Sequence, residues 1–510
     1  MATPAQPLNS NLYSILTGSF LPDSFDPLIR TATGQEILYR EIDVITASYA
    51  AALAELGVAR GDRVLVQVEK SPEALWVYLA SLRLGAIYCP LNTAYTASEV
   101  SYFLDDAEPA VFLTRPDIEK MPQISATYTG AITMTLDAEG GGSLVDMTES
   151  VTPLEEIASV DGNDIAAILY TSGTTGQPKG AMLSHNNLSS NALALHKAWG
   201  FQKGDVLLHA LPLFHVHGLF VAVHCAMLNA SSMLFLPRFD AEEVVRYLPQ
   251  VTVMMGVPTF YSRLLEVAEL DPETCNSIRL FISGSAPLLP EIWYAFRDRT
   301  GFEILERYGM TEAGMITSNP LDGERLPGTV GYPLPKVEVR VTGVQGKSVD
   351  ISEVGMLELR GPNVFQGYWR KPEKTKEEFS TDGFFVSGDL ATMAADGRVS
   401  IVGRQKDLVI SGGLNIYPKE IEEQLNRLEG IMDSAVIGVP HPDLGEALVA
   451  VIVGSMNNVP NQDAVIASLK NVLAGFKVPR RVIQVDELPR NAMGKVQKNI
   501  LREHYRDTLN

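Results

Sequence analysis

An α/β fold, with a large N-terminal domain of several subdomains and a small α+β C-terminal domain, is predicted from three features of the 510-residue sequence. Between about residues 35 and 400, helix-like stretches alternate with short apolar runs, as in α/β proteins. After residue 325 the pattern changes to strand-like pieces separated by turns. The last part, roughly a hundred residues, carries strand and helix signals of its own, enough for a small domain.

The expected elements follow in chain order. RVLVQV (63–68) predicts a buried strand, and ALWVYLASLRLGA (74–86) predicts the helix after it. VTVMMGV (251–257) and IRLFISG (278–284) predict two further strands. The strand-like pieces after residue 325 are VEVRVTG, GMLELRG and GRVSIVG. EGGGSL (139–144) is the one short stretch that looks like a flexible insertion, and no internal repeat is visible.

The domain boundary is predicted near Arg404–Lys406, which divides the chain into residues 1–403 and 404–510. Beyond it, GRQKDLVISGGLNIYPKEIEEQLNRL (403–428) marks the change of pattern. AVIGVP, ALVAVIVG and AVIASLKNVLAGF then supply the strand and helix signals of the small domain.

Composition narrows the function classes. The formal charge of −20 argues against a general nucleic-acid or anionic-membrane surface. No apolar run approaches the roughly 18 residues of a membrane helix. Three widely spaced cysteines, Cys89, Cys225 and Cys275, argue for a reducing compartment and against zinc or disulfide frameworks. Because the first twenty residues carry no positive charge and DTLN is not a peroxisomal signal, the cytoplasm is the expected location.

The stretch TSGTTGQPKG (171–180) predicts a polyphosphate cradle. Its glycines allow close backbone approach, its hydroxyls donate hydrogen bonds, and Lys179 adds a positive charge. The Walker pattern does not apply, because Lys179 lies between Pro178 and Gly180. The competing interpretation is a flexible Gly/Ser turn, but such turns seldom place a lysine and four hydroxyls between two apolar runs.

Eight motifs in one order resemble the adenylate-forming superfamily of acyl-CoA synthetases, peptide-synthetase adenylation domains and luciferases. They are TSGTTGQPKG, LPLFHVHGL (211–219), FISGSAPL (281–288), ERYGMTE (306–312), DGFFVSGDL (382–390), GRQKD (403–407), SGGLNIYPKEIE (411–422) and PRNAMGK (489–495). The resemblance covers essentially the whole chain. It implies an enzyme in which a carboxylate attacks the α-phosphate of ATP, and a thiol then receives the acyl group.

The resemblance implies ATP, Mg²⁺ and coenzyme A as cofactors and assigns their residues. Glu312 and Thr171 match the magnesium site and, with Lys495 and His215, the catalytic set, since a carboxylate suits this hard cation. The phosphate loop comprises Thr171, Ser172, Gly173, Thr174, Thr175, Gly176 and Lys179. The adenine wall and its surroundings comprise Gly284, Ser285, Ala286, Pro287, Glu306, Arg307, Tyr308, Gly309, Met310 and Thr311, and Asp389 with Arg404 matches the ribose-binding pair.

The small domain is expected to be mobile. In the family, Lys495 reaches the α-phosphate and carboxylate only when this domain closes, and Lys406 matches the hinge. The implied CoA path runs past Gly412, Gly413 and Tyr417–Glu420. His215 matches a gate beside the acyl site; paired with His217 alone it makes a poor zinc site. Acylation of Lys495 by an acetyltransferase, reversed by a deacetylase, is a further hypothesis.

The finer resemblance is to malonyl-CoA synthetases, carried by longer wordings such as HALPLFHVHGLFVA, MGVPTFYSRLL and GPNVFQGYWRKPEKT. A dicarboxylate buries a distal carboxylate, so an arginine is expected in the acyl pocket. Arg238 in FLPRFD is the first candidate and Arg279 the second; a solvated or structural role competes for each. Val216 and Met310, with His215, are assigned to the acyl pocket, and methylmalonate is a plausible second substrate.

Four other functions compete. The nearest is an acyl-CoA synthetase for oxalate or for a short or medium monocarboxylic acid, which differs only in the acyl pocket. An amino-acid adenylation module is disfavoured because no carrier site follows Lys495. A luciferase-like monooxygenase would need an aromatic substrate and oxygen. A catalytically silent binding protein is disfavoured by the presence of both Glu312 and Lys495.

Overall fold

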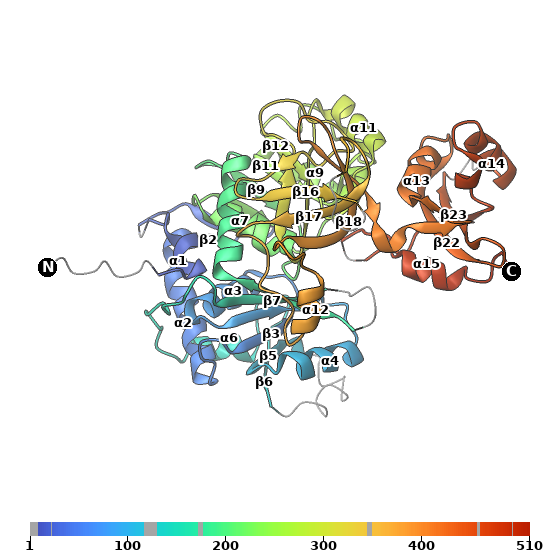
Figure 1. The fold of residues 1–510 in the computed structure, drawn as a ribbon. Helices are drawn as coiled ribbons and strands as arrows, with labels where there is room; N and C mark the ends of the chain where they lie inside the picture. Colours follow the sequence, from blue (N-terminus) through green and yellow to red (C-terminus); the bar gives the residue numbers. More distant parts are fainter. Residues whose placement is uncertain are drawn as a thin grey trace.

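The computed structural model describes residues 9–21, 23–116, 130–171, 177–343, 349–455, 460–491 and 493–509. Figure 1 shows a large body formed by most of the chain, with a small C-terminal domain beside it. The predicted α/β fold with a separate small domain is therefore confirmed. Among the helices of these residues, none has the length and apolar character that crossing a membrane requires.

The first sheet has six strands in the order β6-β5-β3-β4-β7-β8, and only the β7–β8 hairpin is antiparallel. The predicted strand and helix near residue 70 are confirmed as β3 and α3. Ser71 caps α3 and Gly85 ends it in the left-handed conformation. The elements of this part are α2 (Tyr39–Glu55), β3 (Arg63–Gln67), α3 (Pro72–Leu84), β4 (Ile87–Pro90), α4 (Ala97–Ala107), β5 (Val111–Thr114), β6 (Ile132–Thr135), α6 (Ser143–Thr148), β7 (Ile165–Thr171) and β8 (Lys179–Ser184).

The second sheet has nine strands in the order β15-β14-β13-β12-β11-β9-β10-β1-β2. Its centre is parallel, so β11, β12 and β13 end at the same edge, where ligands of open α/β sheets bind. The two strands predicted near residues 254 and 281 are β11 and β12. The strands are β1 (Pro27–Thr31), β2 (Glu36–Leu38), β9 (Val206–His209), β10 (Ser232–Phe235), β11 (Val253–Gly256), β12 (Leu280–Ser283), β13 (Leu305–Met310), β14 (Gly314–Ser318) and β15 (Tyr332–Pro333).

Helices pack around these two sheets, and one of them has an unusual form. The segment η2 is a π-helix that begins at His217 and is buried along its whole length; π-helical turns are frequent at functional sites. The helices are α1 (Leu12–Thr17), α7 (His185–Ala198), η2 (His217–Val223), α8 (His224–Met227), α9 (Ala241–Tyr247), η3 (Leu248–Gln250), α10 (Pro258–Leu264) and α11 (Pro290–Thr300).

A four-stranded antiparallel sheet joins the large body to the small domain, with β18 paired to β19 so that Asp389 lies opposite Arg404. The strand-like pieces predicted after residue 325 form three of its strands. It contains β16 (Glu338–Thr342), β17 (Gly355–Arg360), β18 (Phe385–Met393) and β19 (Val399–Arg404), with α12 (Pro372–Glu377) between β17 and β18.

The small domain begins where the chain leaves this sheet, between Arg404 and Val409. Its five-stranded sheet is covered by three α-helices, and two apolar clusters fill its core. Arg427 Nε lies 3.7 Å from Glu291 Oε1 of the large body. The elements are η5 (Gln405–Asp407), β20 (Val409–Ser411), β21 (Leu414–Ile416), α13 (Pro418–Asn426), β22 (Ile431–His441), β23 (Gly445–Gly454), α14 (Gln462–Lys470), η6 (Gly475–Lys477), β24 (Arg481–Val485) and α15 (Lys498–His504).

One local expectation was wrong. The stretch EGGGSL is a defined turn, because the Asp137 carboxylate accepts hydrogen bonds from the N–H groups of Glu139 and Gly141 at 3.0 and 2.7 Å. Gly142 has a φ of +133°, and a Cβ there would lie 2.4 Å from the Thr135 carbonyl oxygen. The three cysteines are buried and unpaired, as expected for small apolar residues.

Candidate active site

The β7–β8 hairpin carries the predicted phosphate loop at its tip. Thr171 pairs with Lys179 as the last rung, and the Thr171 hydroxyl donates to the Lys179 carbonyl at 3.4 Å. The five residues between them in the predicted loop, Ser172, Gly173, Thr174, Thr175 and Gly176, lie outside the described residues. The hairpin therefore places the Thr171 hydroxyl at the end of β7 and the Lys179 ammonium group at the start of β8.

A line of contacts leads from Lys179 to the predicted magnesium ligand. The Lys179 ammonium lies 3.2 Å from Glu378 Oε1 and 4.1 Å from the centre of the Tyr368 ring. The Tyr368 hydroxyl donates to Glu312 Oε1 at 3.0 Å. Burial raises the pKa of Glu312, while the bond from Tyr368 and the charges of Arg404 and Lys179 lower it. These cations favour the ionised carboxylate.

Glu312 and Thr171 fit a magnesium ion that also binds phosphate. Both offer hard oxygen atoms, and Mg²⁺ is usually held by one or two carboxylates together with substrate phosphates and water. Across the described ranges, no group of three or more His, Cys, Asp or Glu side chains is arranged to hold a metal. The protein alone therefore offers few ligands, and the triphosphate would supply the rest.

Asp389 and Arg404, predicted to bind the ribose, lie opposite each other on the neighbouring strands β18 and β19. Asp389 is buried, and its Oδ1 lies 3.1 Å from Nε of Arg404. The Tyr308 hydroxyl donates a short hydrogen bond to Asp389 Oδ2. Because Glu306 and Tyr308 alternate with Arg307 along β13, the first two share one face of the strand. Tyr308 on that face contacts Asp389, while Glu306 Oε1 accepts the Gly328 N–H at 3.1 Å.

Lys495 is held at the same site by the small domain. Its backbone N–H donates to Asn491 Oδ1 at 3.0 Å, and the neighbouring Met493 is buried in the main core of the large body. A Cβ on Gly494 would lie 3.1 Å from Thr259 Oγ1, so the loop fits closely against α10. Burial and repulsion from Arg404 lower the pKa of Lys495 to about 8, although Asp389 and Glu312 oppose this change.

Arg307 has a different place from the one predicted. The resemblance assigned it to the adenine wall, but strand alternation directs it to the opposite face of β13 from Tyr308. There it is 3 % exposed, and its Nε, Nη1 and Nη2 atoms have no hydrogen-bond partner among the residues that the structure describes. A Cβ on Gly284 would lie 2.3 Å from its Cζ, so the guanidinium lies against the end of β12. Burial lowers its pKa to about 9, leaving it a cation at neutral pH.

The charge of this guanidinium acts on two other residues of the predicted site. Its charge contributes to the lowered pKa of both Lys495 and His215. Burial, then Lys495 and Arg307, lower the pKa of His215 to about 3, so this histidine is neutral. Its Nδ1 accepts the His217 backbone N–H at 3.3 Å. The sequence-based assignment missed the location of the Arg307 side chain. The alternation of side chains along β13 could have predicted it.

Arg279 lies outside the site. It precedes β12, whereas Gly284 and Ser285 follow that strand at its other end. Its Nε and Nη2 atoms bind the two carboxylate oxygens of Asp205 at 2.8 and 2.6 Å, and Asp205 is 2 % exposed. The Arg279 guanidinium is therefore already paired with a buried carboxylate. This contact supports the structural role that competed with substrate binding.

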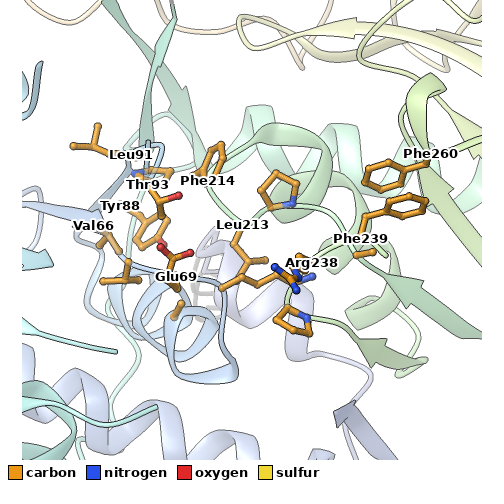
Figure 2. A pocket seen from close by; sticks show the side chains of 17 residues that line it. Val66, Glu69, Tyr88, Leu91, Thr93, Leu213, Phe214, Arg238, Phe239 and Phe260 are labelled. Carbon is orange, nitrogen blue, oxygen red and sulfur yellow. The ribbon is translucent and has the colours of Figure 1, made fainter. Parts of the chain in front are cut away.

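Arg238 is exposed and borders a separate cavity of about 240 Å³. Figure 2 shows it beside Leu213, close to Phe239 and Phe260, whose rings stack 3.8 Å apart. The cavity also contains Lys70, which lies 2.8 Å from His209 Nδ1 and whose pKa burial lowers well below its usual value. Neither His215 nor Arg307 lines it. Arg238 and the Arg307 guanidinium are therefore not lining residues of the same cavity.

The remaining predicted residues fall into three groups. Gly309, Met310 and Thr311 follow Tyr308 at the end of β13, Ala286 and Pro287 follow Ser285, and Val216 is buried beside His215. Gly412 and Gly413 lie on the exposed β20–β21 turn, with φ values of +57° and +80°. Lys406 lies in η5, where the chain passes between domains. The first group is adjacent in the chain to Tyr308, Ser285 and His215, whereas the two glycines lie on an exposed turn of the small domain.

Comparisons with known proteins show which family the chain resembles. The chain matches the family described as AMP-binding enzyme over residues 26–369 and the AMP-binding enzyme C-terminal domain over residues 420–495. It is 34% identical to a probable CoA ligase, CCL8, of Humulus lupulus, covering 90% of this chain and 82% of that protein. It is 36% identical to the mitochondrial malonate–CoA ligase ACSF3 of Mus musculus, covering 84% and 79%.

Among solved structures, the chain resembles MatB of Rhodopseudomonas palustris at 49% identity. The alignment covers 99% of this chain and 100% of that one. The TM-score is 0.96 for the ATP-bound form of MatB and 0.84 for its apo form. The arrangement of the two domains seen here is therefore closer to the ATP-bound form.

Proposed function

The chain belongs to the family of AMP-binding enzymes, and on that premise we propose that it is an ATP-dependent malonate–CoA ligase. In the first step a malonate carboxylate oxygen attacks the α-phosphate of ATP, and pyrophosphate leaves with the electron pair of the broken P–O bond. In the second step the CoA thiol loses its proton and attacks the acyl carbon, and AMP leaves. The products are malonyl-CoA, AMP and pyrophosphate.

The observation that carries the choice of acid is the unpaired guanidinium of Arg307. A buried cation without a partner costs several kcal/mol, and a carboxylate in bidentate contact offsets that cost. The attacking carboxylate must lie by Lys495 and His215. A second carboxylate one carbon away would then lie toward Arg307, whose charge both of those residues sense. A short dicarboxylate supplies both groups.

Monocarboxylic acids fit this site less well. They would leave the guanidinium unpaired, and sites built for a polar group reject analogues that lack it by several orders of magnitude. Methylmalonate differs from malonate by one methyl group, for which discrimination is usually only about 10- to 200-fold. We therefore keep methylmalonate as a second substrate, with Val216 and Met310 setting the space around C2.

Several residues of the chain would stabilise the negative charge on the carboxylate and phosphates in the first step. Lys495 would bring its ammonium group to the attacking carboxylate and the α-phosphate, and Lys179 would do so at the departing phosphates. Glu312, with Thr171, would hold Mg²⁺, which neutralises phosphate charge when bound. Neutral His215 would border the acyl group without adding a cation.

The second step would need the small domain to turn about Lys406. Gly412 and Gly413, now on the exposed turn, would then reach the CoA path, because a hinge between two sheets allows a rigid-body rotation. Regulation by acylation of Lys495 would remove the charge that the first step uses, and peptide mass spectrometry would detect the modified residue. A cytoplasmic location is part of the proposal, and it differs from the mitochondrial name of ACSF3.

The test is the initial rate of AMP formation with Mg²⁺-ATP and CoA across malonate, methylmalonate, oxalate, acetate, butyrate and coumarate. Malonate should be used best and acetate hardly at all. Arg307→Leu should abolish malonate use, whereas Arg238→Ala should not. If Arg238→Ala alone removes malonate use, the sequence-based assignment holds instead, and a wild-type preference for oxalate or a monocarboxylate would contradict the proposed substrate.

A further inference from the structure

Glu312 lies at the tip of the hairpin that β13 and β14 form. Met310 pairs with Gly314 as the last rung, so Thr311, Glu312 and Ala313 make up the connecting loop. The Glu312 residue is 7 % exposed, and its side chain leaves a backbone that is itself enclosed by the protein. The position of the carboxylate therefore depends on what holds this loop.

Two buried asparagines hold the β14 side of the hairpin. Asn191 of α7 accepts the Met315 N–H at 3.0 Å and donates to the Met315 carbonyl at 2.7 Å. Asn363 donates to the carbonyls of Ala313 and Met315 at 2.7 and 3.3 Å. The two asparagines are 6 % and 3 % exposed, so these amides replace water as partners of buried backbone groups.

The close approach of Asn191 requires a glycine at the start of β14. Gly314 has a φ of +57°, in the left-handed region, and a Cβ there would lie 2.5 Å from Asn191 Oδ1. Glycine adopts this conformation without steric cost and leaves room for the amide. One residue thus permits both the bend of the loop and the contact that holds it.

The turn at residues 362–365 supports the loop from another side. The N–H of Phe365 donates to the Glu312 carbonyl at 2.8 Å, and Asn363 of the same turn makes the contacts described above. Asn187 of α7 donates to two carbonyls of this turn, both at 2.8 Å. The turn is therefore fixed to α7 at one side and to the loop at the other.

Helix α7 connects this support to the predicted phosphate loop. It begins at His185, directly after β8, whose first residue is Lys179. Asn187 and Asn191 are four residues apart, so they lie on one face of the helix. A single helix thus links the backbone that carries Lys179 to the backbone that carries Glu312.

We propose that Asn191 and Asn363 are positioning residues, which hold the loop of Glu312 at a fixed place relative to the phosphate loop. The inference rests on the proposed function, in which Glu312 would hold Mg²⁺ and Lys179 would bind the departing phosphates. Misplacing such a group by about 1 Å can cost about 100-fold in rate. The two amides would therefore act on the reaction through Glu312, in addition to stabilising the fold.

The experiment measures how ATP–pyrophosphate exchange depends on Mg²⁺, with the acid that the substrate comparison shows to be used best. Calorimetry with and without Mg²⁺ adds the Kd for ATP, which needs no turnover. Asn363→Ala should raise the half-saturating Mg²⁺ concentration about 10- to 100-fold, while the Kd of metal-free ATP stays that of the wild type. Asn191→Ala should act in the same direction. Asn363→Asp keeps the shape but loses the amide donors, and it gives the same test if the alanine variant fails to fold.

Asn319→Ala is the matched control. Asn319 is 2 % exposed and donates to the carbonyls of Glu306 and Thr329 at 3.1 and 2.9 Å, at the other end of the same two strands. The variant therefore loses two hydrogen bonds to backbone carbonyls, as Asn363→Ala does. Its thermal midpoint should fall by a similar amount, but its Mg²⁺ dependence should match that of the wild type.

A double-mutant cycle shows whether the asparagines act through Glu312. Once Glu312→Gln has removed the carboxylate, Asn363→Ala should weaken Mg²⁺-ATP binding no further. Additive losses, or asparagine variants whose Mg²⁺ dependence matches that of Asn319→Ala, would overturn the inference and leave the proposed function in place. Wild-type Mg²⁺ dependence in Glu312→Gln itself would overturn the magnesium role that the proposed function gives to Glu312, and the inference with it.

Discussion

The ammonium group of Lys179 lies 3.2 Å from the Glu378 carboxylate, and both side chains are largely buried, at 15 % and 23 % exposure. Lys179 stands at one end of the predicted phosphate loop, so a phosphate that binds it must share it with this carboxylate. Glu378 also lies 3.5 Å from Lys374, which gives it a second partner on α12. If Lys179 binds the triphosphate as proposed, Glu378 competes with the phosphates for its ammonium group.

Replacing Glu378 should strengthen ATP binding. Glu378→Gln removes the competing charge and keeps the side-chain shape, so the Kd for ATP measured by calorimetry should fall about 3- to 10-fold, in line with roughly 1 kcal/mol for such a pair. Glu377→Gln is the control, because Glu377 pairs only with Lys374 at the surface. Weaker ATP binding in Glu378→Gln would show that this carboxylate positions Lys179 instead of competing for it.

Removing the Tyr368 hydroxyl should shift the acid side of the pH profile. The bond from Tyr368 lowers the pKa of Glu312, which burial raises. In Tyr368→Phe that pKa rises further, so Glu312 is protonated at a higher pH, and Mg²⁺-dependent pyrophosphate exchange should be lost earlier as the pH falls. Tyr332→Phe, whose hydroxyl contacts Asp396 and Arg398 far from the site, should leave the profile unchanged. Coincident acid limbs in wild type and Tyr368→Phe would contradict the coupling.

The arginines show which parts of the candidate site the sequence alone could predict. The motif order predicted the fold, and the family resemblance implied the pairing of Asp389 with Arg404, which lie opposite each other on β18 and β19. The alternation of side chains along a strand was sufficient to predict that Arg307 and Tyr308 lie on opposite faces of β13. The prediction instead grouped them by motif and so assigned both to the adenine wall. The role of Arg279 depends on Asp205, which is 74 residues away in the chain and belongs to none of the motifs. The exposure of Arg238 is likewise a result of packing that no local pattern encodes.

Lys495 should react as an unusually acidic lysine. Its pKa of about 8, against the usual 10.5, follows from burial and from the charge of Arg404. In competitive labelling with a small anhydride, Lys495 should therefore be modified at pH 8 well before surface lysines, because a larger fraction of it is the neutral amine. Mg²⁺-ATP should protect it, since a nearby anion raises its pKa. Labelling that follows the average surface lysine would contradict this prediction, and Lys470, on the small domain and away from the site, serves as the reference.

Two arginine variants should differ in their effect on stability. Arg279→Leu breaks a bidentate pair and leaves the buried Asp205 carboxylate without its cation, so it should destabilise the protein by about 3 kcal/mol. Arg307→Leu removes a buried charge that has no partner in the described structure, so its thermal midpoint should stay the same or rise. Malonate should raise the midpoint of the wild type but not that of Arg307→Leu, because a ligand stabilises only the form that binds it. A fall in stability of Arg307→Leu as large as that of Arg279→Leu would mean that Arg307 is a structural residue, and the malonate site would then have to be sought around Arg238.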